Sequence, residues 1–181
     1  MLAWEKIELW ESRMMKQTLE SLIGELLVRD NMTLGVAESC TGGKVCDRLT
    51  NIPGSSVYFM GGIVAYAYEA KMKLLSVSWD TLKAHGAVSR QVVLEMARGV
   101  RRALDTTLGV SVSGIAGPAG ETDEKPVGTT WIGLSSPDGD WARSFCWKGD
   151  RLQNKEASAE EVLQMLYDYL QGERHLDLEK A

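Results

Sequence analysis

Ser39 and Lys71 are the two side chains of this sequence best suited to act together in covalent catalysis. A serine hydroxyl is a weak nucleophile until a base removes its proton. A lysine becomes such a base when burial and a nearby helix N-terminus lower its pKa from ~10.4 toward ~7–8. Tyr66 lies at the end of a predicted strand, where its hydroxyl would relay a proton or orient the pair. The alternative is that Lys71 is an ordinary exposed lysine on a helix.

The segment around the serine joins a predicted strand, residues 33–37, to a predicted helix that starts at Lys44. Free N–H groups at a helix start favour an anion, and glycines let a ligand approach the backbone. We therefore expect a phosphate or the oxyanion of an acyl-transfer step to bind here. The simpler alternative is that Ser39 or Thr41 only caps the helix. The connecting residues are Ser39, Cys40, Thr41, Gly42 and Gly43.

Cysteines and histidines give little support to a metal site or a disulfide. The three cysteines have no C-x-x-C spacing, and the two histidines have no metal-ligating neighbours, so no metal is expected. His85 follows a short predicted helix and His175 falls in the tail, which leaves both poorly placed as a base. Cys40 is next to Ser39 and stays open as a rival nucleophile, which would make the protein a thiol enzyme.

Length, charge and hydropathy limit the class of protein. The 181 residues suit one domain, and 44% hydrophobic with 25% charged residues is ordinary globular composition. The net charge of −5 disfavours nucleic acid and anionic membranes as partners, but not a small anionic ligand. No apolar run reaches the ~18 residues of a membrane span. The N-terminus lacks the basic and apolar regions of a signal peptide, so we expect a cytoplasmic protein.

Strand and helix patterns alternate along the chain and predict an α/β fold. The sequence predicts a three-layer α/β/α sandwich with a mixed, mostly parallel five-stranded sheet. Two Gly-rich loops follow buried strands, after Ala37 and after Ser113, and should meet over one cleft. The predicted helices cover residues 3–29, 44–49, 69–75, 79–84, 90–103 and 155–170, and the predicted strands cover 33–37, 57–67, 108–113, 127–135 and 141–147.

The two ends of the chain are set apart from this core. Residues 1–14 are predicted as an N-terminal helical extension, 15–171 as the functional domain and 172–181 as a charged tail that frays. Trp4, Ile7 and Trp10 extend an apolar face toward the N-terminus. That face would either pack on the core or serve as the contact between copies of the chain. We expect the protein to form a homo-oligomer.

Seven short motifs follow one another at compatible spacing, and together they resemble the CinA carboxy-terminal domain family over roughly residues 15 to 170. They are Ala37-Glu38-Ser39-Cys40-Thr41-Gly42-Gly43, Pro53-Gly54-Ser55-Ser56, Tyr66-x-x-Glu69-Ala70-Lys71, Gly86-Ala87-Val88-Ser89, Ser113-Gly114-Ile115-Ala116-Gly117-Pro118, Glu124-Lys125-Pro126-Val127-Gly128-Thr129 and Gly149-Asp150-Arg151.

The resemblance implies a fold, a reaction and a set of roles. The fold is a three-layer sandwich, and the reaction is hydrolysis of the carboxamide of nicotinamide mononucleotide to nicotinate mononucleotide and ammonia. It implies Ser39 as nucleophile, Lys71 as base and Tyr66 as helper, with a small-molecule nucleotide as partner and no cofactor. The residues implied to hold the substrate are Cys40, Thr41, Gly42, Gly43, Gly114, Ala116 and Gly117.

Some positions differ from the family pattern. Ala67 and Tyr68 stand where the family usually has Ser and Asn, Glu121 replaces a Gly, and Lys155 replaces an Arg. These changes leave a second hypothesis open, in which the chain binds a nucleotide or a protein without turnover.

Overall fold

The computed structural model describes residues 18–173 and 176–179. The predicted extension 1–14, with Trp4, Ile7 and Trp10, lies outside the described residues, and the homo-oligomer stays a prediction. The helices are α2 (Leu19–Arg29), α3 (Lys44–Thr50), α4 (Tyr68–Leu75), α5 (Trp79–His85), α6 (Arg90–Ala103) and α7 (Arg151–Leu170). The strands are β1 (Leu34–Glu38), β2 (Phe59–Val64), β3 (Leu108–Gly114), β4 (Thr129–Ser136), β5 (Gly139–Cys146) and β6 (Leu178–Glu179).

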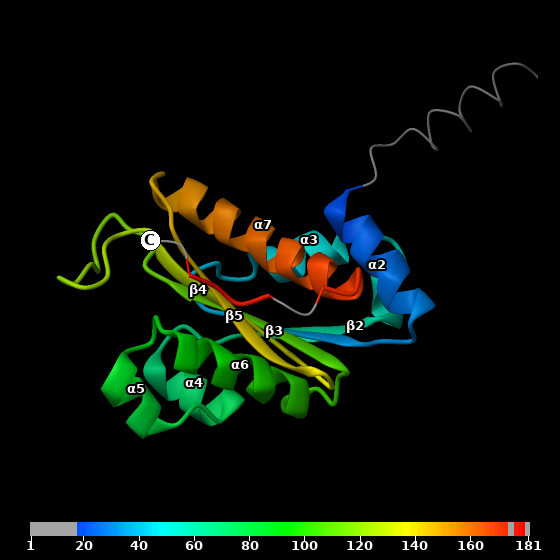
Figure 1. The fold of residues 1–181 in the computed structure, drawn as a ribbon, viewed down its shortest axis with the longest axis horizontal. Helices are drawn as coiled ribbons and strands as arrows, with labels where there is room; N and C mark the ends of the chain where they lie inside the picture. Colours follow the sequence, from blue (N-terminus) through cyan, green and yellow to red (C-terminus); the bar gives the residue numbers. More distant parts are fainter. Residues whose placement is uncertain (1–17, 174–175, 180–181) are drawn as a thin grey trace, which may run out of the picture.

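The strands form one mixed sheet in the order β2-β1-β3-β4-β5-β6. β1 runs parallel to both β2 and β3, the β3–β4 and β4–β5 pairs are antiparallel, and the short β6 runs parallel to β5. Helices α2, α3 and α7 cover one face and α4, α5 and α6 cover the other (Figure 1). The predicted three-layer α/β/α sandwich is therefore confirmed, with the two-residue β6 added to the five expected strands.

Each face of the sheet buries its own apolar cluster, because successive strand residues point to opposite faces. On one face Val36 packs with residues of α2 and α7, among them Leu27 and Leu163. On the other face Ala37 packs with residues of α4 and α6, among them Leu75 and Met96. Burial of the two clusters holds β1 in the interior of the sheet, between β2 and β3, and the end of β1 is where the serine lies. Within the described residues, no helix is both long and apolar enough to cross a bilayer.

The described part of the tail is ordered against the sheet, so the expectation that it frays is wrong there. The Leu176 side chain is fully buried, and its carbonyl accepts a hydrogen bond from Arg143 Nε at 3.0 Å. The Asp177 carboxylate accepts from the backbone N–H of Ala142 at 2.8 Å. β5 offers unpaired backbone groups at the edge of the sheet, and the tail satisfies some of them.

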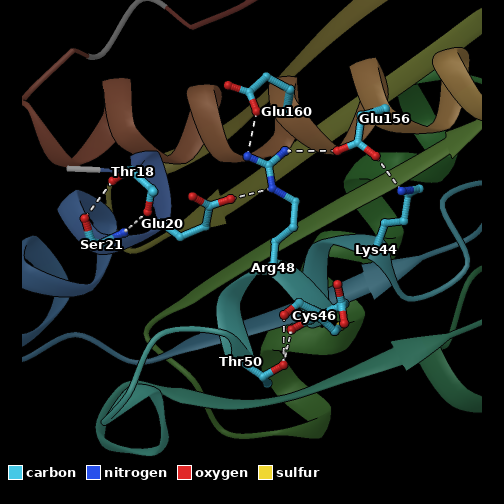
Figure 2. Close-up of polar contacts among 10 residues, drawn as sticks. Thr18, Glu20, Ser21, Lys44, Cys46, Arg48, Thr50, Glu156 and Glu160 are labelled. Atoms are coloured by element: carbon cyan, nitrogen blue, oxygen red, sulfur yellow. Dashed lines mark hydrogen bonds and ion pairs between the residues drawn. The ribbon is translucent and has the colours of Figure 1, made fainter. Parts of the chain in front are cut away.

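Charged side chains join the three helices of one layer (Figure 2). The guanidinium of Arg48, on α3, forms ion pairs with Glu20 of α2 and with Glu160 of α7, the latter at 2.6 Å. Glu156, on α7, lies 3.8 Å from Arg48 and also pairs with Lys44. The Arg48 side chain is only 20% exposed, so its charge depends on these carboxylates for compensation. The cluster ties the helix that follows the serine to the two neighbouring helices.

Replacing the central arginine should destabilise the fold in a pH-dependent way. Arg48→Met should lower the free energy of unfolding at pH 7 by about 2 kcal/mol, because it removes the cation that pairs with Glu20 and Glu160. The Lys44 hydrogen bond lowers the pKa of Glu156. The pKa of Glu20 is also lowered, since its backbone and Arg48 hydrogen bonds outweigh the opposing effect of burial.

Carboxyl groups with lowered pKa values stabilise the fold above their unfolded pKa of 4.5, and this contribution is lost as the pH falls through their lower folded values. The difference between wild type and Arg48→Met, measured by urea unfolding, should therefore shrink in acid. Arg29→Met is the matched control, because the Arg29–Asp30 pair lies at the surface, where solvent screens an ion pair and its effect on stability is small. Equal effects of the two substitutions would contradict a structural role for the cluster.

Candidate active site

The carboxyl ends of three neighbouring parallel strands bring the site together. Glu38, the last residue of β1, is in register with Val64 of β2 and Val112 of β3. The chain segments that leave these strands therefore meet at one edge of the sheet, as in other open α/β sheets. Ser39 follows β1 directly, and its backbone N–H donates to the carbonyl of Val112 at 3.0 Å, which fixes the serine over this edge.

Lys71 reaches the serine from the first turn of α4. Its Nζ donates hydrogen bonds to Ser39 Oγ at 2.9 Å, to the carbonyl of Ala65 at 2.7 Å and to the carbonyl of Tyr66 at 3.2 Å. The Lys71 side chain is fully buried, and Ser39 is 7% exposed. Burial disfavours the ammonium form and lowers the pKa of Lys71 to about 8. The predicted pair is thus in contact, and Lys71 is not the exposed helix lysine of the alternative.

Of the three hydrogen-bond partners of Lys71, only the Ser39 hydroxyl has a proton that it can give to the neutral amine. An ammonium group has three N–H donors, and here each has an acceptor. Neutral lysine keeps two N–H donors and gains one lone pair. The two carbonyl oxygens can only accept, whereas the Ser39 hydroxyl can also donate. Loss of a proton from Lys71 therefore directs its lone pair at the serine hydroxyl, which is the arrangement that general-base catalysis requires.

The Tyr66 side chain lies at the rim of the site, and its hydroxyl is not a hydrogen-bond partner of the Lys71 ammonium group. Its side chain is 63% exposed, and its hydroxyl accepts a hydrogen bond from Arg151 Nη2 at 3.1 Å. Arg151 Nη1 donates to the carbonyl of Gly117 at 2.6 Å. Lys71 contacts the backbone carbonyl of Tyr66 and not its phenol. The guanidinium therefore joins the segment after β2 to the loop after β3, and it brings a positive charge to the site.

Arg151 is a site residue that the analysis of single residues did not single out. The structure shows a complete capping box at Asp150 and Gln153, which starts α7 at Arg151 and not at the predicted residue 155. The Gly149-Asp150-Arg151 motif carries the signal, because an Asp N-cap places the next residue on the first turn of a helix. Asn154, one turn later, donates from Nδ2 to the carbonyl of Ala116 at 3.1 Å and holds the same loop.

A cavity of about 250 Å³ opens between these segments. Gly114 needs to be glycine here, because a Cβ would lie 2.5 Å from Thr130 Oγ1. Ala87 and Val88, which precede α6, and Ser113 complete much of the wall. The predicted residues that line this cavity are Ser39, Cys40, Tyr66, Lys71, Gly114, Ala116 and Gly117, and Arg151 lines it as well.

Thr41, Gly42 and Gly43 are not among the residues that line this cavity in the part of the chain that the structure describes. The Gly43 N–H donates to Glu38 Oε2 at 2.8 Å, and the Cys46 N–H donates to Glu38 Oε1 at 2.9 Å. The fully buried carboxylate of Glu38 therefore caps α3 from within the chain. These N–H groups at the start of α3 therefore already have an anionic partner, and the proposed contact of Thr41, Gly42 and Gly43 with a substrate stays a prediction.

Comparison with known proteins gives one family. A sequence profile of the CinA C-terminal domain matches residues 16–170. A CinA-like protein of Desulfosudis oleivorans is 50% identical over 149 residues, which cover 82% of this chain and 36% of that protein. A CinA-like protein of Desulfotalea psychrophila is 45% identical over 155 residues, covering 86% of this chain and 38% of that protein. The chain thus spans just over a third of the length of these relatives.

Solved structures agree with this assignment. The crystal structure of the competence damage-inducible protein A from Klebsiella pneumoniae is 29% identical with a TM-score of 0.83, and the match covers 86% of this chain and 97% of that one. A competence/damage inducible protein from Agrobacterium tumefaciens is 34% identical with a TM-score of 0.79, over 84% of this chain and 95% of that one. From the profile, the relatives and the shared fold, the chain belongs to the CinA C-terminal domain family.

Proposed function

We propose that this chain hydrolyses the carboxamide of nicotinamide mononucleotide, giving nicotinate mononucleotide and ammonia. The observation that carries the proposal is the buried contact of 2.9 Å between Lys71 Nζ and Ser39 Oγ, with a lysine pKa lowered to about 8. Such a pair suits acyl transfer at neutral pH. The family resemblance suggests the substrate, and Arg151 supports it because a nucleotide is an anion.

The proposed reaction has two halves. Neutral Lys71 takes the proton of Ser39 as the serine oxygen attacks the carboxamide carbon. When the tetrahedral intermediate collapses, the C–N bond breaks, Lys71 returns the proton to the leaving nitrogen, and ammonia departs. The acyl group stays on Ser39 as an ester. Lys71 then takes a proton from water as the water oxygen adds to the ester, and it returns that proton to the serine oxygen as the C–O bond to Ser39 breaks. The carboxylic acid product loses its remaining proton to solvent and leaves as the carboxylate.

Tyr66 and Arg151 have the supporting roles in this proposal. Arg151 holds the Tyr66 phenol at the cavity rim, and the backbone carbonyl of Tyr66 accepts a hydrogen bond from Lys71. The guanidinium favours the anionic substrate, and the tyrosine narrows access to the cavity. We propose Cys40, Gly114, Ala116 and Gly117 as substrate-contacting wall residues, because they line the cavity beside Ser39.

Ammonia release from nicotinamide mononucleotide by the purified chain tests the proposal. We expect one equivalent of nicotinate mononucleotide for each ammonia, with the product identified by mass. A folded chain that binds the nucleotide and releases no ammonia would support the second candidate, a binding module without turnover. The changes at Ala67 and Tyr68 favour that candidate, whereas Glu121 is exposed and is absent from the lining of this cavity.

Cys40 should be dispensable for this activity. Its side chain is 5% exposed, and burial raises the pKa of its thiol to about 12, so thiolate is scarce at neutral pH. We expect Cys40→Ala to keep kcat within about fivefold of wild type, because it changes one wall contact and the packing beside Gly114 but removes no reacting atom. Steady-state ammonia assays of Cys40→Ala and Ser39→Ala would decide between the nucleophiles. Activity that survives in Ser39→Ala and disappears in Cys40→Ala would establish a thiol enzyme.

A further inference from the structure

A second cavity of about 520 Å³ adjoins the one that contains Ser39. The two cavities share Ala87, Val88, Ile115 and Gly120 in their walls. The cavity at Ser39 has a volume of about 250 Å³, which is below the ~300–1,000 Å³ typical of small-molecule sites. A substrate of nucleotide size therefore needs space beyond the inner cavity, and the outer cavity is the adjoining space.

Tyr68 holds one wall of the outer cavity in place. Its hydroxyl oxygen accepts a hydrogen bond from the backbone N–H of Ala87 at 3.2 Å. Its ring packs edge-to-face on Trp79, with the ring centroids 6.2 Å apart and the planes at 74°. Tyr68 is one of the positions that differ from the family pattern, and an asparagine side chain at this position is too short to make the same contact. Here the tyrosine fixes the segment that both cavities share.

Lys125 ties the loop after β3 to the end of α5, next to the same segment. Its Nζ donates to the carbonyl of His85 at 2.6 Å. Asp123 and Glu124, next to it in the chain, also line the outer cavity. This part of the molecule thus offers one ammonium group and two carboxylates around a single space. Carboxylates recognise the hydroxyl groups of a ribose, and an ammonium group recognises a phosphate.

We propose that the outer cavity is the subsite for the sugar phosphate end of the substrate, and that Tyr68 is a positioning residue that sets its shape. The inference rests on the proposed function, in which the carboxamide lies in the inner cavity at Ser39. The ribose hydroxyls face Asp123 and Glu124, and the phosphate faces Lys125. The chain therefore selects amides that carry a phosphorylated sugar over the free amide.

Two fragments of the substrate separate the two cavities. Ribose 5-phosphate probes the outer cavity and nicotinamide probes the inner one, and their dissociation constants are measured by ligand-observed NMR without any turnover. In Tyr68→Phe we expect the dissociation constant of ribose 5-phosphate to rise about fivefold, as for one lost hydrogen bond. In Lys125→Met we expect a rise of more than about tenfold. The constant for nicotinamide should change less than about twofold in both variants.

Lys73→Ala, an exposed change on the same helix, should alter neither constant. In ammonia assays Tyr68→Phe should raise KM for nicotinamide mononucleotide and leave kcat within about twofold, a split that general loosening of the fold would not give. Two results overturn this inference even if ammonia is released. In one, ribose 5-phosphate does not bind wild type; in the other, it binds Tyr68→Phe and Lys125→Met as tightly as it binds wild type. Binding with this pattern and no ammonia release overturns the proposed function and keeps the subsite.

Discussion

Ser39→Ala and Lys71→Met should each lower kcat for ammonia release from nicotinamide mononucleotide by at least ~10³-fold. Ser39→Ala removes the atom that forms the acyl-enzyme, and Lys71→Met removes the base that contacts it at 2.9 Å. The double variant should be little worse than either single variant, because the two groups act as one unit. Steady-state ammonia assays of the three variants beside wild type measure both effects.

Lys73→Met is the matched control for the lysine, since Lys73 lies on the same helix and is exposed. It should keep wild-type kcat. Urea unfolding of each variant shows whether the fold survives, which separates lost chemistry from lost structure. Full activity in Lys71→Met would remove the lysine from the mechanism. Equal losses in Lys71→Met and Lys73→Met would point to a general effect on α4.

The rate should depend on pH through Lys71. Only the neutral amine can take the serine proton, and the pKa of this lysine is lowered to about 8 by burial. The logarithm of kcat/KM should therefore rise with unit slope up to about pH 8 and then level off. At pH 6 the value should be about 100-fold below the plateau. A pH series of kcat/KM at constant ionic strength measures the profile, and a flat profile from pH 6 to 9 would contradict a lysine base.

Lys71 should also make the free energy of unfolding depend on pH. The unfolded pKa of a lysine is 10.5 and the folded pKa of Lys71 is lowered to about 8. Between these two values the unfolded state binds more protons, so stability from this group rises with pH across that window. Below about pH 8 Lys71 is charged in both the folded and the unfolded state, so its contribution to the free energy of unfolding no longer changes with pH. Urea unfolding at pH 7 and pH 10 should show this rise in wild type and not in Lys71→Met.

Residue types and the family resemblance together predicted Ser39 and Lys71 as a candidate pair, and the structure places the two side chains in contact, but the surroundings of the pair were not predicted. Ser39 follows a buried strand and Lys71 lies on the first turn of the next helix but one, so parallel strands alone bring them to one edge. Arg151 comes from α7, far along the chain, and its contact with Tyr66 depends on how that helix packs over the sheet. Periodicity within one segment does not contain such information.

Two other differences between the sequence-based expectations and the structure also come from tertiary contacts. Glu38 was expected only as part of a motif, and its role depends on burial that closes its carboxylate over the start of α3. The tail was expected to fray because it is charged, but Leu176 and the open edge of β5 outweigh that charge. In both cases tertiary contacts determine the outcome, and a local pattern does not report them.

The carboxylate of Glu38 acts as a ligand that is covalently attached to its own binding site. Its effective concentration at the N–H groups of Gly43 and Cys46 is therefore set by the short chain between them and does not change with the composition of the solution. Free phosphate or sulfate would have to displace a tethered competitor and leave a buried carboxylate without partners. Raising the concentration of such anions should thus not inhibit the protein through this helix start.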